Sequence, residues 1–359
     1  MTQNAIHKAR YWHPSADKDA IVCTCCPRQC ELRDGQRGFC FSRKNTGGQL
    51  DLTSYGRVIG LCVDPIEKKP LNHFMPGTGV LSFGTAGCNL GCRFCQNWTM
   101  SKADSYDQAS RPIQPDEIAE EALAQNCPSV AFTYNDPTIF TEYAMDVADA
   151  CHERGIKTVA VSAGYIGAEA RRDLYSKVDA ANIDLKAFTD DFYQKLCLGV
   201  SLQDVLDTLL YIKHETSTWL EITTLLIPGE NDSTEELMDM IEWIHENLGP
   251  DVPLHFSAFH PDFKMMHRPR TPLTTLLRAR DIAMGSGMNY VYIGNAHHQH
   301  ADSTWCPGCG KCVIERDWYQ LGAYHLDGGK CRDCGYTIAG IFPGKEHGNH
   351  GPARRRVEM

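Results

Sequence analysis

The segment FGTAGCNLGCRFCQNW, residues 83–98, decides how this chain folds and what it binds. It places Cys88, Cys92 and Cys95 in the spacing CxxxCxxC, with no fourth cysteine in the local run. Three thiolates this close can hold one four-iron cluster and leave one iron open, whereas structural and electron-transfer clusters normally use four protein ligands. The spacing therefore indicates a cluster with room for a cofactor or substrate. A zinc knuckle with a remote fourth ligand, such as a histidine, is the alternative, because thiolates also bind zinc.

The composition is typical of a globular chain. Its 359 residues suggest two or three domains, and its hydrophobic content of 42% is enough for a sizeable core. The net charge of -10 argues against non-specific nucleic-acid binding over the whole surface. We find neither a signal peptide nor an apolar run of the ~20 residues that a membrane helix needs, so we expect a cytoplasmic protein without membrane association.

Between residues 79 and 295 short β-rich runs alternate with amphipathic helical runs. This alternation predicts βαβ units and an α/β fold with a parallel sheet. The number of runs favours an open, partial TIM-type (β/α)6 barrel over the closed eightfold barrel, with its chemistry on the loops at the carboxyl ends of the strands. The predicted strands are 80–83, 129–134, 157–162, 181–185, 219–226, 254–259 and 290–293, and the predicted helices are 115–126, 138–154, 168–177, 202–214, 234–247 and 272–285.

The chain has 17 cysteines, and without a secretory signal they indicate metal binding or catalysis rather than disulfides. The N-terminal group offers Cys23, Cys26, Cys30 and Cys40, with two, three and nine residues between them, and leaves Cys25 as a surplus member. Four thiolates around tight turns predict a metal site. Their spacing does not separate zinc from an auxiliary iron–sulfur cluster.

The C-terminal cysteines form two CxxC pairs 21 residues apart, Cys306 with Cys309 and Cys331 with Cys334. This is the spacing of a zinc ribbon, and four thiolates complete a tetrahedral zinc, so we expect a structural or partner-docking role. Cys312 is interpreted as a neighbour of this site. Small, buried, apolar side chains are expected for the scattered cysteines Cys62, Cys127, Cys151 and Cys197.

The positions of these motifs divide the chain into four predicted parts. They are a cysteine-rich N-terminal segment (1–78), the barrel (79–300), a zinc-ribbon-like module (301–342) and a disordered polar tail (343–359).

Several ordered motifs together carry a family resemblance. They are TYNDPTIF (133–140), VSAGYI (161–166), NIDLKAF (182–188), LEITTLLIPGENDS (220–233), YVYIGNAH (290–297) and DPIEKKPLNHFMPGTG (64–79). With the CxxxCxxC spacing and Phe94 before its last cysteine, the chain resembles the AmmeMemoRadiSam-system radical S-adenosylmethionine (SAM) enzymes, relatives of the pyruvate formate-lyase activating enzyme. The resemblance covers about residues 20–340.

The resemblance implies a radical SAM barrel whose cluster is held by Cys88, Cys92 and Cys95. It also implies SAM contacts from residues at several further strand ends. Tyr134, Asn135 and Asp136 stand where the superfamily has the GGEP segment that binds the methionyl amine, Asp184 and Lys186 match a DLK segment near SAM, Ser162 is expected near the ribose, and Gly294 and Asn295 near the adenine. The chain departs from the pattern at the first of these places, because Tyr-Asn replaces Gly-Gly and Asp replaces Glu.

The resemblance further implies an enzyme that cleaves SAM to a 5′-deoxyadenosyl radical and abstracts hydrogen from an unidentified small-molecule, peptide or RNA substrate. The catalytic residues cannot be named from the sequence. A flavodoxin or ferredoxin is the expected electron donor, with proteins of the AmmeMemoRadiSam system as further candidate partners. The alternatives are an activase of glycyl radical enzymes and a non-catalytic zinc-binding interaction module. About 75 residues before the cluster and the ribbon after the barrel can cover the barrel mouth, which favours a substrate smaller than a protein loop.

Overall fold

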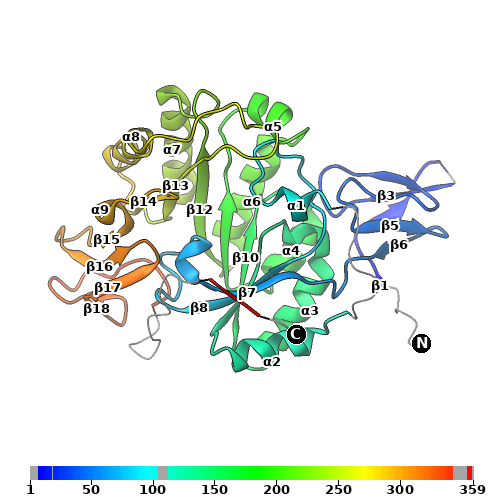
Figure 1. Ribbon diagram of the computed structural model, residues 1–359, viewed down its shortest axis with the longest axis horizontal. Helices are drawn as coiled ribbons and strands as arrows, with labels where there is room; N and C mark the ends of the chain where they lie inside the picture. The colour runs from blue at the N-terminus through cyan, green and yellow to red at the C-terminus, as the bar shows by residue number, and fades with distance from the viewer. Residues whose placement is uncertain (1–6, 18, 104–111, 343–353, 358–359) are drawn as a thin grey trace.

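A nine-stranded sheet forms the centre of the computed structural model, which describes residues 7–17, 19–103, 112–342 and 354–357 (Figure 1). Its strand order is β14-β13-β12-β11-β10-β9-β8-β7-β20, and the strands from β8 to β14 pair in parallel, which confirms the predicted open α/β barrel. The parallel strands are β8 (Gly79–Gly84), β9 (Ser129–Phe132), β10 (Lys157–Ser162), β11 (Ala180–Asp184), β12 (Trp219–Leu226), β13 (Leu254–Ala258) and β14 (Val291–Gly294).

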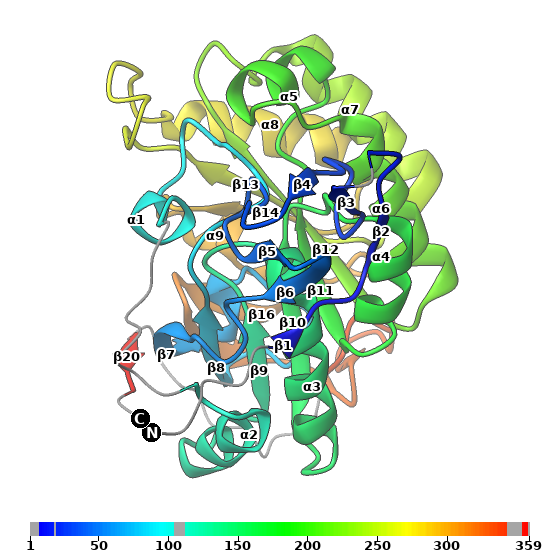
Figure 2. The ribbon, with the colours of Figure 1, turned by 90° about the vertical axis from the view of Figure 1, so that its right-hand side faces the viewer.

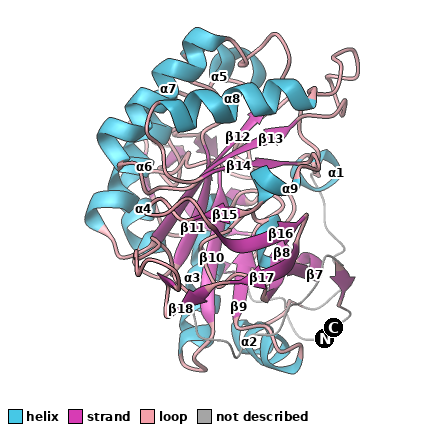
Figure 3. Ribbon diagram, turned by 90° about the vertical axis from the view of Figure 1, so that its left-hand side faces the viewer, coloured by secondary structure: helices cyan, strands magenta, loops and turns pink. Residues whose placement is uncertain are grey.

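Helices connect successive parallel strands and lie along the outer side of the sheet (Figure 3). The predicted helices are α2 (Pro115–Ala124), α3 (Thr141–His152), α4 (Ala168–Tyr175), α6 (Leu202–Glu215), α7 (Thr234–Leu248) and α8 (Leu273–Gly285). The predicted helix 138–154 covers α3 and most of the 3-10 turn η2 (Pro137–Phe140) before it. The prediction did not include α1 (Trp98–Ser101), α5 (Asp190–Leu196), α9 (Gln299–Asp302) and the 3-10 turn η1 (Ile66–Lys68). Among the described helices, none combines the length and the apolar character needed to cross a membrane.

The local sequence explains where these elements begin and end. Helix α7 starts where the hydroxyl of Ser233 accepts a hydrogen bond of 3.1 Å from the amide of Glu236, and it ends at Gly249, whose φ of +89° favours glycine. The strands are buried on both faces, as in β8, where every residue is buried.

The N-terminal segment forms two small antiparallel sheets beside the barrel (Figure 2). A buried ion pair joins it to the barrel, because Arg43 Nη2 lies 2.6 Å from Glu142 Oε2 on α3. One sheet has the strand order β1 (His7–Lys8), β6 (Gln49–Leu52) and β5 (Arg43–Thr46). The other has the order β2 (Trp12–Pro14), β3 (Ala20–Cys23) and β4 (Glu31–Arg33).

The C-terminal module lies on the opposite side of the barrel from the N-terminal sheets (Figure 1). Buried Arg316 joins it to the chain before the barrel, since its Nη2 donates 2.7 Å to the carbonyl oxygen of Asn72. The strands of the module are β15 (Thr304–Trp305), β16 (Cys312–Asp317), β17 (Gln320–Tyr324), β18 (Leu326–Asp327) and β19 (Lys330–Cys331).

Two segments differ from the predicted boundaries. Strand β7 (Ile59–Pro65) pairs antiparallel with β8, so the sheet begins inside the segment that was expected to precede the barrel. The prediction of a disordered tail over 343–359 is wrong for residues 354–357, because β20 (Arg355–Arg356) pairs antiparallel with β7. The edge strand offers unpaired backbone groups that the tail satisfies. The rest of that predicted tail, 343–353 and 358–359, lies outside the described residues.

Candidate active site

A cavity of about 620 Å³ opens at the carboxyl ends of the parallel strands. Every residue predicted for the cluster and for SAM lines it. The residues come from the loops after β8, β9, β10, β11 and β14: Cys88, Cys92, Cys95, Tyr134, Asn135, Asp136, Ser162, Asp184, Lys186, Gly294 and Asn295. The fold thus brings together positions that are up to about 200 residues apart in the chain, as the parallel topology predicts.

The loop that carries the three cysteines is held in place by its neighbours. Asn135 Nδ2 donates to the carbonyl oxygens of Thr85 at 2.8 Å and Gly87 at 2.9 Å. A Cβ on Gly87 would lie 2.0 Å from the carbonyl oxygen of Cys40, and the φ of +93° also favours glycine. The loop therefore depends on the N-terminal segment as well as on the barrel.

The three thiols of the cluster loop are not grouped as closely as ligands of a single ion would be. Sulfurs around one tetrahedral zinc lie about 3.8 Å apart, from a zinc–sulfur bond of about 2.3 Å. Among the described residues, no group of three ligand atoms within 4.8 Å of one another includes Cys88, Cys92 or Cys95. All three nevertheless face one cavity, as ligands to three different irons would.

The environment of the three thiols is uneven. Burial raises the pKa of Cys88, whereas a hydrogen bond with the thiol of Cys197 lowers the pKa of Cys92 to about 7. Cys197 also accepts a hydrogen bond of 3.0 Å from the amide of Gly91 through its carbonyl oxygen. All four scattered cysteines are buried as predicted, but the position of Cys197 behind the cluster loop was missed, since nothing in the spacing indicates it.

The loop after β9 is only partly available to a cofactor. The Asp136 carboxylate is buried and accepts hydrogen bonds from the amides of Thr138 at 3.0 Å and Ala163 at 2.8 Å, and from the Ser162 hydroxyl at 3.1 Å. Its burial raises its pKa, an effect that these bonds oppose. Asp136 therefore caps η2 and joins two strand ends, and a direct bond from it to SAM stays a prediction.

Asp184 and Lys186 form an ion pair at the end of β11. Lys186 Nζ lies 2.6 Å from Asp184 Oδ2, and the lysine side chain is 12% exposed whereas the aspartate is 35% exposed. Burial lowers the pKa of Lys186, but the Asp184 carboxylate and the sulfurs of Cys92 and Cys197 together outweigh it and hold that pKa well above its usual range. Asp184 lines the cavity, and since Lys186 is bonded to its Oδ2, its second carboxylate oxygen can accept a further hydrogen bond.

The last predicted pair, Gly294 and Asn295, follows β14. A Cβ on Gly294 would lie 3.4 Å from Ser257 Oγ, which is an ordinary contact distance, so the absence of a side chain at Gly294 adds little space to the cavity. Asn295 has a φ of +55°, and its carbonyl oxygen accepts a hydrogen bond of 2.7 Å from Arg270. Both residues of this turn line the cavity, and a contact of the turn with the adenine stays a prediction.

The sequence predicted that the segment before the cluster and the ribbon can cover the barrel mouth, but it named none of the residues that form these walls of the cavity. The segment before the cluster contributes residues around η1, and the C-terminal module contributes a second wall. Within the described residues, neither carboxylate oxygen of Asp302 has a hydrogen-bond partner, and burial raises the pKa of Asp302 to about 6. These walls include Glu67, Lys68, Lys69, Asp302, Arg316, Trp318 and Tyr319, together with Arg354 of the tail.

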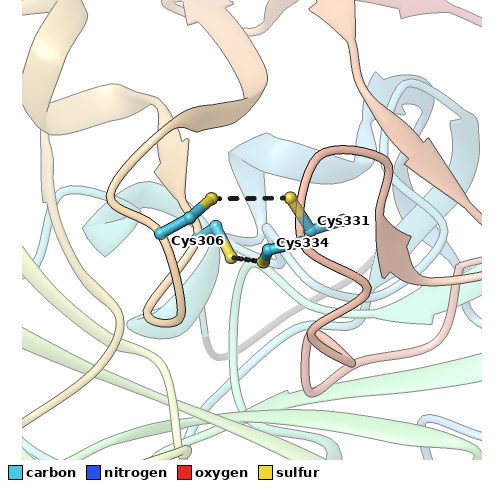
Figure 4. A group of neighbouring side chains, drawn as sticks. Cys306, Cys331 and Cys334 are labelled. Atoms are coloured by element: carbon cyan, nitrogen blue, oxygen red, sulfur yellow. Dashed lines mark hydrogen bonds between the residues drawn. The ribbon is translucent and has the colours of Figure 1, made fainter.

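The C-terminal cysteines have a different geometry. The ligand sulfurs of Cys306, Cys309, Cys331 and Cys334 all lie within 4.8 Å of one another. The distances are 3.6 Å from Cys306 to Cys334 and 3.8 Å from Cys309 to Cys331, close to the value for one tetrahedral ion. Figure 4 shows Cys306, Cys331 and Cys334 pointing toward one another from two loops. A zinc-ribbon-like module is thereby confirmed, and Cys312 lies outside its group.

Comparison with known proteins gives the family. A model described as the radical SAM superfamily matches residues 83–241. An uncharacterized protein of Methanocaldococcus jannaschii is 40% identical over 329 residues, which are 91% of this chain and 97% of the relative. A GTP 3',8-cyclase of Lactiplantibacillus plantarum is 22% identical over 66% of this chain and 75% of its own length. A pyruvate formate-lyase-activating enzyme of Clostridium pasteurianum is 23% identical over 42% of this chain and 63% of its own length.

Proposed function

This chain is an enzyme of the radical SAM superfamily, and we propose that it belongs to the AmmeMemoRadiSam type and abstracts a hydrogen atom from a substrate bound in the barrel cavity. The observation that carries the proposal is the convergence of the cluster loop and four other strand-end loops on that one cavity. A non-catalytic zinc-binding module would not require these loops to meet.

The cofactors of the family are a four-iron cluster and SAM, and the residues present fit both. In the proposal Cys88, Cys92 and Cys95 hold the cluster. When bound, the cluster supplies the electron that cleaves SAM reductively to a 5′-deoxyadenosyl radical. An external one-electron donor of the flavodoxin or ferredoxin class is then required.

The chain's own residues bind and orient SAM in this proposal. The free oxygen of Asp184 accepts a hydrogen bond from the cofactor, and Lys186 holds that carboxylate in one position through the 2.6 Å ion pair. Asp136 and Ser162 act together, because the Ser162 hydroxyl donates to the Asp136 carboxylate at 3.1 Å. Asn135 keeps the cluster loop in register, while the Tyr134 backbone and the Gly294–Asn295 turn line the cavity beside it.

The walls of the cavity favour a small-molecule, peptide or RNA substrate. Residues around η1, the C-terminal module and the tail all line it, so the barrel mouth is covered from three directions. A glycyl radical activase has to admit a loop of a folded protein partner. Activation of such an enzyme is the second candidate, supported by the similarity to the Clostridium pasteurianum enzyme.

We also propose zinc at the C-terminal cysteines, since four sulfurs at this separation complete a tetrahedral site and leave no open position for catalysis. The role is structural. The boundaries proposed for the parts of the chain are those given by the sequence, with β7 and β20 added to the barrel sheet.

The test of the proposed function is anaerobic reconstitution with iron and sulfide. The protein should absorb broadly near roughly 400 nm, from thiolate-to-iron charge transfer, and release 5′-deoxyadenosine from SAM under dithionite. Cys88→Ala, Cys92→Ala and Cys95→Ala should each lose cleavage and part of the absorbance. Unchanged iron content and cleavage in all three variants would refute the assignment of these ligands.

A further inference from the structure

The N-terminal thiols form a second site that the proposed function does not use. Cys23, Cys26, Cys30 and Cys40 line one small pocket between the N-terminal sheets and the cluster loop. A Cβ placed on Gly38 would lie 3.8 Å from both the Cys30 and the Cys40 sulfur, so these two thiols face the same point. Residues up to 17 positions apart in the chain are thus gathered around one centre.

The fifth cysteine of this group is excluded by its contacts. Cys25 is 2% exposed, and its thiol donates to the carbonyl oxygen of Thr138 at 3.1 Å, which ties it to η2 of the barrel. The other four are therefore the ligand set, as the spacing of two, three and nine residues predicts.

The way the four sulfurs are grouped favours one metal over the other. Among the described residues, the ligand atoms of only one cysteine group lie within 4.8 Å of one another, and that group is the C-terminal one. Sulfurs on one zinc need about 3.8 Å between them, whereas sulfurs on four different irons lie farther apart. The N-terminal thiols share a pocket without that close approach, and in this respect they resemble Cys88, Cys92 and Cys95.

A buried cation completes the pocket. Arg43 is 1% exposed and lines it, and two of its nitrogens are used by Glu142 at 2.9 and 2.6 Å. Within the described residues its Nε has no hydrogen-bond partner. A buried N–H without a partner is costly, and a thiolate or a sulfide of a cluster would satisfy it.

The pocket and the active-site cavity share a wall. Cys88 lines the cavity, and the next residue, Asn89, lines the pocket. Arg28 Nε donates to the carbonyl oxygen of Asn89 at 2.6 Å, and the Ser42 hydroxyl donates to that of Ala86 at 3.1 Å. Adjacent residues are about 3.8 Å apart along the chain, so only the cluster loop separates the two sites.

We propose that Cys23, Cys26, Cys30 and Cys40 bind a second four-iron cluster that relays single electrons to the barrel cluster. Cys26 and Cys30 are only partly buried, so a flavodoxin- or ferredoxin-type donor can approach this side. The donor is oxidised by giving one electron to the N-terminal cluster, which is thereby reduced. The N-terminal cluster is reoxidised when it passes that electron to the barrel cluster. No bond is formed or broken and no proton is transferred in the relay. The relay role rests on the proposed SAM chemistry, whereas the identity of the metal does not.

The first experiment identifies the metal without reference to activity. The full chain with Cys88, Cys92 and Cys95 all changed to Ala is reconstituted anaerobically, and iron, sulfide and zinc are measured together with the Mössbauer spectrum. About four irons per chain should remain, because the N-terminal site is intact. Cys26→Ser with Cys30→Ser on this background should remove them, and Cys25→Ala should not. Zinc in place of iron, or a two-iron spectrum, would overturn the proposal.

The second experiment tests the relay in a chain with the barrel cysteines intact. Cleavage of SAM is driven either by dithionite, which reduces accessible clusters directly, or by reduced flavodoxin. In Cys26→Ser/Cys30→Ser the ratio of flavodoxin-driven to dithionite-driven cleavage should fall tenfold or more relative to Cys25→Ala. An unchanged ratio would overturn the relay. Failure of the proposed function can be told apart from failure of the relay, because without the proposed function the unaltered protein would cleave SAM with neither reductant.

Discussion

Each end of the chain carries four cysteines that the sequence predicts to bind a metal, and the two groups differ in space. The C-terminal thiols Cys306, Cys309, Cys331 and Cys334 gather within 4.8 Å of one another on hairpin-like loops of their own module. The N-terminal thiols share a pocket without forming such a group, and their pocket is closed by residues of the barrel. Four cysteines therefore do not define a metal by themselves. The proposals of zinc at the C-terminal group and of iron at the N-terminal group rest on this difference in how their sulfurs are grouped.

The two ends also differ in what holds them to the barrel. The N-terminal sheets contribute Arg43 to a buried ion pair with Glu142. The C-terminal loops that carry Cys309 and Cys334 expose those two cysteines, so few apolar contacts would keep them in place without a metal. We expect the loss of metal to affect the C-terminal module more strongly than a comparable change at the N-terminus.

Removal of the C-terminal zinc should have the largest effect on stability. Cys331→Ser with Cys334→Ser should release about one zinc and lower the melting temperature by roughly 10 °C or more, because structural zinc contributes several kcal/mol to local folding and each kcal/mol is worth about 2–4 °C in chains of 150–250 residues. Zinc analysis and calorimetry check this under argon. The iron spectrum should stay unchanged, and iron in place of zinc would contradict the assignment.

The comparison also shows what sequence can and cannot supply. The periodic runs predicted the parallel strands to within a few residues, because buried strands and amphipathic helices carry local signals. Strand β7 was missed, and the short edge strand β20 was assigned to disorder because its antiparallel pairing depends on a partner about 290 residues away. The sequence predicted that the site residues lie together because they follow the ends of parallel strands. It did not reveal that the Asp136 carboxylate accepts hydrogen bonds from Ser162, Ala163 and Thr138.

Breaking the ion pair at the N-terminus is the second largest change. Arg43→Met leaves Glu142 buried without its guanidinium, and such a loss costs about 3–5 kcal/mol. Urea unfolding of the reconstituted protein should show it. Arg33→Met is the matched control, because Arg33 also lies in the N-terminal sheets and pairs with Asp17, but the two side chains are 71% and 45% exposed, and exposed pairs contribute about 0–1 kcal/mol. Equal losses in both variants would mean that the N-terminal segment is not anchored through Arg43.

Asp184→Asn separates SAM binding from folding at the barrel rim. If the carboxylate binds SAM, its replacement should weaken SAM affinity and slow 5′-deoxyadenosine formation by tenfold or more, in line with a charge-assisted hydrogen bond of about 1.5–3 kcal/mol. The iron and zinc contents of the protein should not change in this variant. Calorimetric titration of cluster-loaded protein measures the affinity, and wild-type affinity would mean that Asp184 serves only its ion pair with Lys186.

Asp136→Asn is the matched comparison for Asp184→Asn. The Asp136 carboxylate accepts its hydrogen bonds from the protein itself, so its replacement should lower the free energy of unfolding by about 1–3 kcal/mol. Stability should thus change more at Asp136 and SAM affinity more at Asp184. If instead Asp136→Asn mainly weakens SAM affinity, Asp136 binds the methionyl amine of SAM, as the family resemblance implies.

The smallest effect is expected at Cys312, the cysteine beside the C-terminal group. It lies on β16, next to the loop that carries Cys306 and Cys309, and it is partly buried, but it lies outside the group of four close sulfurs. Cys312→Ser should therefore keep about one zinc per chain and change the free energy of unfolding by less than about 1 kcal/mol, as a substitution outside a metal site usually does. The same zinc analysis and calorimetry as for Cys331 and Cys334 measure both quantities. Loss of zinc in this variant would show that Cys312 is a zinc ligand in place of one of the four close cysteines. Close sulfur distances would then no longer identify the metal ligands at either end of the chain.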